Sequence, residues 1–281
     1  MRPARLAVSI LFFVNGAVLA SWLPHIPAVK ARLTSGDGQL GLVLLALAAG
    51  AVVALPAAGW LIDRVGSRLM SSVAAIALCL AMPLPVLSPS LPALVASLAL
   101  LGACNGLLDV SMNAQAAAVE RRAGRPIMSS FHALFSVGGV AGALGAGGAM
   151  SLGMGDLAHV GAAALVALGA VGLALPRLLP APPTREAAGP ALARPSGALL
   201  TLGVLALLGL LAEGAMADWS AVYLHDTLGA SPAVPPSDSP RSPWPWRPGV
   251  SPVMRWSVGW VPAWCCESSA PSRRPALPAR C

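Results

Sequence analysis

The sequence of 281 residues contains few charged side chains, because Asp, Glu, Lys and Arg together make up only 10% of it. A soluble domain carries about a quarter charged residues, so this scarcity excludes an ordinary soluble globular protein. Hydrophobic residues make up 56% of the chain, and the mean hydropathy is +0.74. The composition therefore predicts a protein whose main partner is the lipid bilayer.

The sequence also lacks the patterns of common catalytic, metal-binding and nucleic-acid-binding sites. Its five cysteines show neither metal-ligand spacing nor a disulfide framework. There is no nucleotide-binding loop, catalytic triad or metal cluster, which argues against a pump or a membrane enzyme. The 18 basic residues form no basic face with aromatic residues between the charges, which excludes a nucleic-acid partner. We expect no enzymatic activity, no catalytic residue, no cofactor and no metal.

Long apolar runs dominate what remains. A helix that spans a bilayer needs about 20 mostly apolar residues, and seven segments meet that requirement: 6–27, 39–62, 69–88, 92–117, 128–152, 157–179 and 197–224. A signal peptide, suggested by Arg2 and Arg5 before the run LAVSILFFV, is the less economical interpretation because many further spans follow. The pattern predicts an all-α integral membrane protein.

The order of the spans predicts four parts. Residues 1–180 form an N-terminal bundle of six transmembrane helices, and residues 181–196 form a linker. Residues 197–231 hold a seventh transmembrane helix, and residues 232–281 form a C-terminal tail that is disordered by composition.

The tail changes abruptly from Ala, Leu and Gly to Pro, Trp, Arg and Ser. We interpret it as a frameshifted reading of further helices, after about residue 234. Reading one base earlier turns each Trp codon into one for Leu, Met or Val, and most Pro codons into Ala codons. The chain would then be a truncated transporter. The rival interpretation is a genuine external tail rich in Pro and Trp.

Basic residues near the helix ends are distributed unevenly, and such residues favour the cytoplasmic side. With the N-terminus inside, the outer side holds only Lys30 and Arg32. The cytoplasmic side then holds Arg2, Arg5, Arg64, Arg68, Arg121, Arg122, Arg125, Arg177, Arg185 and Arg194. The bias predicts a multi-pass protein with a cytoplasmic N-terminus and linker and with Asp226 outside.

In the fifth span, small residues recur every four positions. Gly138, Gly142 and Ala146 share one helix face, with Gly145 and Ala149 on the next. Such spacing lets two helices approach closely in lipid. The face is either a tightly packed helix contact or a surface that slides during a conformational change.

The loop between the second and third spans reads GWLIDRVGSR, residues 59–68. Gly66 permits a sharp turn, and Asp63 can cap or pair with a neighbouring helix end. The segment resembles the loop signature of the major facilitator superfamily, with Ser67 where a basic residue is common. The residues that carry the resemblance are Gly59, Asp63, Arg64, Gly66 and Arg68.

Two further segments, at 109–139 and 213–231, are similar to a branch of bacterial inner-membrane facilitators near the fucose-permease-like sugar transporters. The resemblance covers about residues 1–234. It implies a monomeric secondary transporter in the bacterial inner membrane that carries a small, polar, sugar-like solute by alternating access. In that family the loop packs against the second six-helix half and latches the cytoplasmic side shut, so it is a gating loop.

The fourth span carries three polar residues on one side, since Asn105, Asp109 and Asn113 follow one another at i, i+4 and i+8. At 1.5 Å per residue, Asp109 lies about 16 Å from Glu120 along the helix, close to the middle of the bilayer. An acid at that depth is costly and is a functional hypothesis by default. The alternative is an Asp paired with polar groups of a neighbouring helix purely for packing.

Glu213 in the seventh span is a second acid of this kind, unless the helix breaks near Gly214 and leaves it at the outer mouth. Asn15 and Trp22 in the first span could line a cavity, where the Trp ring would stack on a sugar; a Trp near a helix end is otherwise an interface residue. The sequence thus predicts a solute site, with proton coupling, or symport, through one of the acids.

Three alternatives remain for the function. One is a truncated half-transporter without a complete solute pathway, and another is an exporter of drugs or metabolites. A half-size unit that pairs with its own copy is disfavoured, because an odd seventh helix does not restore the symmetry of two equal halves.

Overall fold

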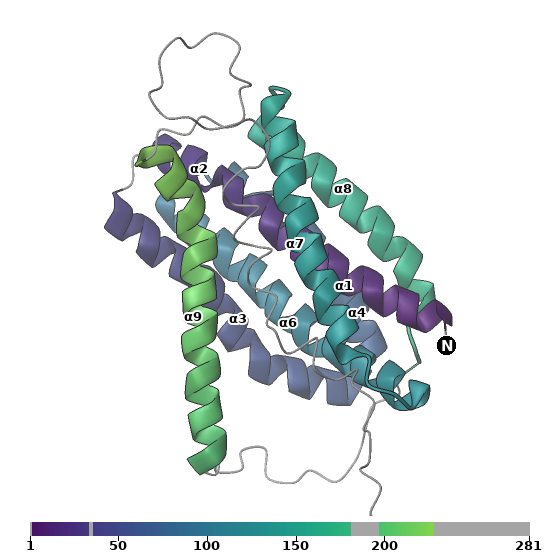
Figure 1. The fold of residues 1–281 in the computed structure, drawn as a ribbon. Coiled ribbons are helices and arrows are strands. Elements are labelled where there is room, and N and C mark those ends of the chain that lie inside the picture. Colours follow the sequence, from purple (N-terminus) through teal and green to yellow (C-terminus); the bar gives the residue numbers. More distant parts are fainter. Residues whose placement is uncertain (1, 34–35, 181–196, 228–281) are drawn as a thin grey trace, which may run out of the picture. The chain divides into compact units, whose positions relative to one another are not determined.

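The computed structural model describes residues 2–33, 36–180 and 197–227, and every regular element in these ranges is a helix (Figure 1). The helices are α1 Arg2–Trp22, η1 Leu23–His25, α2 Ile26–Arg32, α3 Asp37–Val65, α4 Ser67–Ala81, α5 Leu84–Leu87, α6 Leu91–Ala123, α7 Met128–Ser151, α8 Asp156–Ala174, η2 Leu175–Arg177 and α9 Gly197–Asp226.

The chain divides into two units, residues 1–235 and 236–281, and all described residues belong to the first. The predicted linker at 181–196 and the whole of the predicted tail at 232–281 fall on residues outside the described ranges, so these parts of the sequence-based scheme stay predictions.

Seven helical segments of the described chain are long and apolar enough to cross a membrane: Arg2–Arg32, Asp37–Val65, Ser67–Leu87, Leu91–Ala123, Met128–Ser151, Asp156–Arg177 and Leu200–Asp226. They confirm the seven predicted spans and the all-α membrane fold. The main difference is at the ends, since α6 continues to Ala123 instead of stopping near residue 117. The apolar run ends near residue 117, but α6 keeps its backbone hydrogen bonds through the charged residues that follow.

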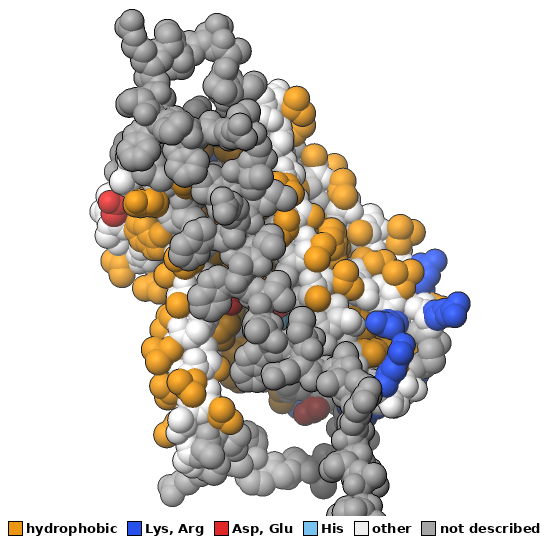
Figure 2. All heavy atoms as spheres, in the orientation of Figure 1, with side chains coloured by type: hydrophobic (Ala, Val, Ile, Leu, Met, Phe, Trp, Pro, Cys, Tyr) orange, Lys and Arg blue, Asp and Glu red, His pale blue; other side chains and the backbone are white. Residues whose placement is uncertain are grey.

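Arginine residues are concentrated at one end of the spans, which we call the Arg-rich end. It contains the start of α1 and the ends of α3, α6 and α8, with Arg2, Arg64, Arg121 and Arg177 among its residues. Figure 2 shows Lys and Arg side chains clustered at one end of the visible face, while hydrophobic side chains spread along the helices. We call the other end of the spans the opposite end.

Six of the spans form two three-helix repeats, α1–α3–α4 and α6–α7–α8. The first helix of each repeat packs most extensively against the second helix of the other, α1 against α7 and α6 against α3 (Figure 1). The third helices follow the same exchange, because α4 packs on α6 and α8 packs on α1. This reciprocal contact pattern is that of an inverted repeat, and it makes α1 and α6 the central helices.

Glycines bring the helix pairs into backbone contact. A Cβ atom added at Gly138 or Gly142 of α7 would lie closer than 3.0 Å to the carbonyl oxygen of Phe13 or Ala17 in α1. The small-residue face predicted for this helix is therefore a tight helix contact, and Ala146 on the same face is fully buried. In α3 and α6, Gly50 and Gly102 allow the equivalent approach.

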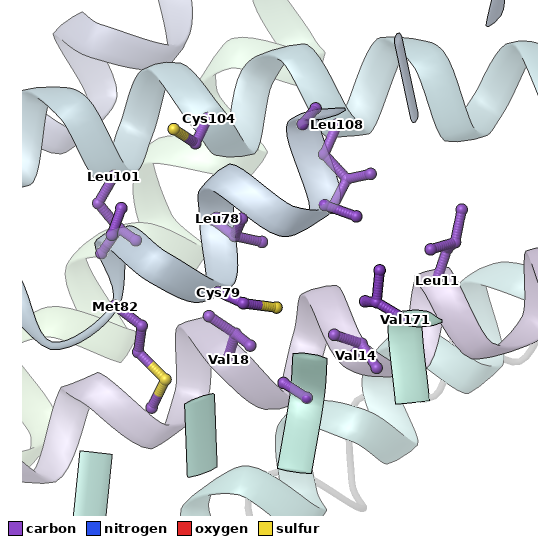
Figure 3. Packing of buried hydrophobic residues seen from close by; sticks show 14 of the residues in the cluster. Leu11, Val14, Val18, Leu78, Cys79, Met82, Leu101, Cys104, Leu108 and Val171 are labelled. Carbon is purple, nitrogen blue, oxygen red and sulfur yellow. The ribbon is translucent and has the colours of Figure 1, made fainter. Parts of the chain in front are cut away.

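The core between the repeats consists of small and medium apolar side chains. Figure 3 shows Leu11, Val14 and Val18 of α1 among side chains contributed by α4, α6 and α8. The residues labelled there from these three helices and the segment that follows α4 are Leu78, Cys79, Met82, Leu101, Cys104, Leu108 and Val171, all buried. The core thus joins both repeats through α1.

Helix α9 is different, because it is apolar but largely exposed. In the described part of the chain its polar link to the bundle lies near its C-terminal end, where the Asp226 carboxylate pairs with the Lys30 ammonium at 2.5 Å. Val222 is buried there, and Trp219 packs against the core. From Leu200 to Met216 its side chains are exposed, so this surface needs lipid or further protein to cover it.

We predict that Gly138→Ala destabilises the bundle by about 1–3 kcal/mol, the usual cost of overpacking, because its Cβ would press on the α1 backbone. Thermal unfolding of the detergent-solubilised chain measures the effect. Gly148→Ala in the same helix is the matched control, since a Cβ there meets no atom within 4 Å. Equal unfolding midpoints for the two variants would show that the contact between α1 and α7 does not limit stability.

Candidate functional site

The polar residues of α6 lie on successive turns near the middle of the helix. Asp109 is eighteen residues after Leu91 and fourteen before Ala123. The Asn113 Nδ2 group donates hydrogen bonds to Asp109 Oδ1 at 3.1 Å and to the Asp109 backbone oxygen at 2.9 Å. The Asp109 side chain is exposed on the surface of the bundle, and no cation of the described chain pairs with it.

Two buried amide oxygens lie on the central helices beside this acid. Asn15 of α1 is 1% exposed, and its Nδ2 is 4.0 Å from Met112 Sδ on α6. Asn15 Oδ1 and Asn105 Oδ1 are both buried without a hydrogen-bond partner in the described chain. A buried acceptor without a donor costs about 1–3 kcal/mol, so such atoms call for an explanation, and an absent ligand is one.

Helix α7 brings a histidine toward the same region. The His132 ring contacts Phe12 edge-on, with ring centroids 5.2 Å apart. It is close enough to interact electrostatically with the Asp109 carboxylate, although no hydrogen bond joins the two side chains. No spacing in the sequence links His132 to Asp109, because their proximity arises from helix packing.

The other two predicted site residues lie apart from this group. Trp22 is 2% exposed within α1, so its ring is covered in this conformation, and its indole Nε1 has no partner in the described chain. Glu213 is exposed on α9 and forms no hydrogen bond or ion pair with the described residues. Their roles at a solute site stay predictions.

Most of the predicted loop is helical, because residues 59–65 belong to the end of α3 and residues 67–68 to the start of α4. The chain turns at Gly66 alone, whose φ of 84° favours glycine. Asp63 and Arg64 precede the turn and are exposed, and the Arg64 guanidinium lies 4.0 Å from the centre of the Trp60 ring. Arg68 Nη2 donates to the backbone oxygen of Pro176 at 3.4 Å, which ties the loop to η2, the short helix that follows α8. Asp63 makes no ion pair within the described chain, so its carboxylate is available to another partner.

A fully buried glutamine anchors this loop from α6. Gln115 Nε2 donates to Ser67 Oγ at 2.9 Å and to the Leu179 backbone oxygen at 3.1 Å. Its Oε1 accepts a hydrogen bond from the Leu179 N–H at 3.1 Å. Gln115 therefore joins α6 to the first residue of α4 and to the segment after η2. No pattern in the sequence indicated this role for Gln115.

A second polar anchor closes the connection between α6 and α7. Glu120 Oε2 accepts hydrogen bonds from the backbone N–H groups of Ile127 and Met128, both at 2.7 Å. A carboxylate at the start of a helix satisfies free N–H groups and interacts favourably with the helix dipole. The Arg-rich end is thus held together by side-chain to backbone hydrogen bonds.

These features define a membrane protein with a polar stripe (Asn105, Asp109 and Asn113) in the middle of α6 and an anchored, arginine-containing turn at Gly66. The sequence profile of the Major Facilitator Superfamily matches residues 8–241. The chain therefore belongs to the Major Facilitator Superfamily.

Among curated proteins, the chain is similar to an uncharacterized MFS-type transporter of Yersinia pestis, with 38% identity over 82% of this chain and 59% of that protein. It is 36% identical to an uncharacterized transporter of Sinorhizobium fredii, over 78% of this chain and 58% of that one. The membrane protein MosC of Rhizobium meliloti is 35% identical, over 78% and 53%. The chain thus spans little more than half the length of these relatives.

Among solved structures, the nucleoside transporter NupG, as its D323A mutant, aligns with a TM-score of 0.60 and 17% identity. The alignment covers 81% of this chain and 60% of that one. At this identity the likeness establishes the fold alone.

We predict that Gln115→Leu destabilises the Arg-rich end, because it leaves the buried Leu179 N–H without an acceptor, at a cost of about 1–3 kcal/mol. The variant should unfold at a lower temperature, and trypsin should cleave faster after Arg64 and Arg68. Gln39→Leu is the matched control, since Gln39 is exposed at the start of α3. Unchanged cleavage in Gln115→Leu would mean that the loop is held without this side chain.

Proposed function

We propose that this chain forms the N-terminal half of a secondary transporter that carries a small polar solute by alternating access. The solute site is built from Asn15, Asn105, Asp109 and Asn113. Membership of the Major Facilitator Superfamily supports transport as the general function. The nature of the solute and the coupling are inferred from the site.

The observation that carries the proposal is the environment of Asp109. Its carboxylate is exposed in the middle of a span and is hydrogen-bonded only to Asn113, one turn away on the same helix. A packing role would require polar partners on a neighbouring helix, and none accepts or donates to it in the described chain. Because a charge facing hydrocarbon is costly, this face is expected to border a water-filled cavity, closed by the half of the transporter that the relatives carry beyond the matched region.

The solute class follows from the chemistry of the site. Amide groups and a carboxylate can accept hydrogen bonds from hydroxyl or amino groups, so a polyol-like or amine-bearing solute fits better than an apolar one. Sugars are favoured by the resemblance of the sequence to fucose-permease-like transporters. Nucleosides are a second class of solute to test, because NupG, whose solved structure has a similar fold, is a nucleoside transporter.

Proton coupling is the second part of the proposal. Asp109 and His132 lie on adjacent helices within electrostatic range of each other, and both can gain or lose a proton. Intramembrane Asp and His residues of this kind serve as proton relays in transporters. Glu213 on α9 is a further candidate acid, which would join the site when the second half is in place.

The loop after α3 supplies the gate in this proposal. Arg68 and Gln115 hold it to α8 and α6, while Asp63 remains free to pair with the second half. The latch therefore forms and breaks at Asp63 without disturbing the anchored part of the loop. The Arg-rich end is assigned to the cytoplasm, by the preference of basic residues for that side, in a bacterial inner membrane.

We predict that Asp109→Asn lowers solute uptake about 10- to 100-fold while membrane insertion is retained, since the amide can neither carry charge nor exchange a proton. Uptake of labelled sugars and nucleosides is measured in cells that also express the part of the Yersinia pestis relative beyond the matched region. The control Asp37→Asn makes the same chemical change at an exposed site away from Asn105, Asp109 and Asn113. This variant should transport the solute normally. Normal uptake by Asp109→Asn would assign Asp109 to packing.

We also predict that positions on either side of α7 face opposite compartments. In a cysteine-free background, Arg125→Cys should be protected from a membrane-impermeant thiol reagent in intact cells, and Leu152→Cys, 85% exposed, should be labelled. Labelling of the cysteine at 125 from outside, with protection at 152, would reverse the proposed orientation.

A further inference from the structure

A groove of about 740 Å³ lies between α1, α7 and α8, and none of Asn105, Asp109 and Asn113 lines it. Its walls are mostly small and apolar, and they include Ile10, Ala17, Ala141, Gly145, Ala163 and Val166. The glycine and alanine residues that α7 and α8 contribute leave room for the groove, because they carry little side-chain volume.

The groove runs along the membrane-spanning part of the helices. It reaches from Leu6 to Ser21 along α1, which is about 22 Å at 1.5 Å per residue. All three walls are membrane-length spans, so the medium beside the groove is hydrocarbon. Water does not fill an apolar space of this kind, whereas a lipid acyl chain matches it in length and polarity.

One end of the groove carries a polar group that is built into the fold. His159 of α8 lines the groove at the opposite end and is 6% exposed. Its Nδ1 lies 2.9 Å from Nε2 of His25, and Nδ1 of His25 lies 2.9 Å from Asp156 Oδ1. His25 is completely buried, which makes these two contacts the partners of its ring.

The chain of contacts from Asp156 through His25 leaves one ring nitrogen of His159 open to a ligand. When both imidazole rings are neutral, Asp156 accepts from His25 Nδ1–H and His25 Nε2 accepts from His159 Nδ1–H. His159 Nε2 then carries a lone pair and has no partner in the described chain. Because His159 lines the groove, this nitrogen can accept a hydrogen bond from an occupant.

We propose that the groove binds a phospholipid with a primary amine headgroup, phosphatidylethanolamine. Its acyl chain occupies the apolar groove, and its ammonium group donates to His159 Nε2 beside the Asp156 carboxylate, which is 35% exposed. A choline headgroup has the same charge but no N–H to donate, and an anionic headgroup is repelled by Asp156. The site is independent of the proposed solute site and of its transport activity.

Native mass spectrometry of the purified full chain, mixed with equal amounts of phosphatidylethanolamine, phosphatidylcholine and phosphatidylglycerol, tests the proposal. We expect phosphatidylethanolamine to bind about tenfold more tightly than either competitor, which is the effect of one hydrogen bond to a charged group. His159→Phe should abolish this preference while still binding lipid through the groove. Equal occupancy by the three lipids in the wild-type chain would overturn the proposal.

A second pair of variants tests the groove itself, even if His159→Phe does not fold. Gly145→Leu places a side chain into the groove from α7, where an added Cβ meets no atom within 4 Å. Gly148→Leu is the matched control on the same helix, also unobstructed but outside the groove lining. With a phosphatidylethanolamine that carries a photoreactive group on its acyl chain, crosslinking to α7 and α8 should fall about tenfold in Gly145→Leu only. Equal crosslinking in both variants places the lipid elsewhere.

Discussion

The backbone contact between α1 and α7 is the constraint on which the arrangement of polar groups depends. Gly138 and Gly142 allow α7 to lie against the carbonyl groups of α1, and α1 in turn contacts α6 and α8. The contact with α7 holds His132 against Phe12 and within range of Asp109, while the contacts of α1 and the η1 segment after it with α6 and α8 include Asn15 beside Met112 and His25 against His159. A wider separation of α1 and α7 would move His132 away from Phe12.

The contact between α1 and α7 is important because these helices associate within a lipid bilayer. In a bilayer, apolar side chains gain little by leaving hydrocarbon, so helices associate through close packing of small residues and through hydrogen bonds. Both means are present here: glycines join the α1–α7 and α3–α6 pairs, and Gln115 and Glu120 bind backbone groups at the Arg-rich end. Four buried side-chain polar atoms of the described chain lack a hydrogen-bond partner: Asn15 Oδ1, Trp22 Nε1 and Asn105 Oδ1 are on the central helices α1 and α6, and Ser71 Oγ is on α4.

The sequence alone predicted the features that depend on position along one helix. Apolar runs revealed the seven spans, the four-residue spacing of Gly138, Gly142 and Ala146 indicated a close contact, and the spacing of Asn105, Asp109 and Asn113 put them on one side of α6. Features that join distant helices were not predictable in this way. His132, Gln115 and the His25–His159 contact acquire their roles only when different helices pack together, which joins residues 23, 48 and 134 positions apart in sequence.

The acidic residues divide into two groups by their surroundings. Asp156 and Asp226 have basic or histidine partners within the described chain, and their contacts join helices. Asp63 and Asp109 form no ion pair or hydrogen bond with a basic or histidine side chain in the described chain, although His132 lies within electrostatic range of Asp109. The relatives extend well beyond the matched region, and in the proposed mechanism these two acids act together with the second half of the transporter.

The central claim is that the Asp109 side of α6 faces a water-filled solute pathway. Reaction of introduced cysteines with a water-soluble thiol reagent tests it most directly, in a chain whose own cysteines have been replaced. Asp109→Cys and Asn113→Cys should react rapidly, while Leu100→Cys, on the other side of α6 and 49% exposed, should be protected by lipid. Protection at 109 and 113 equal to that at 100 would contradict the claim.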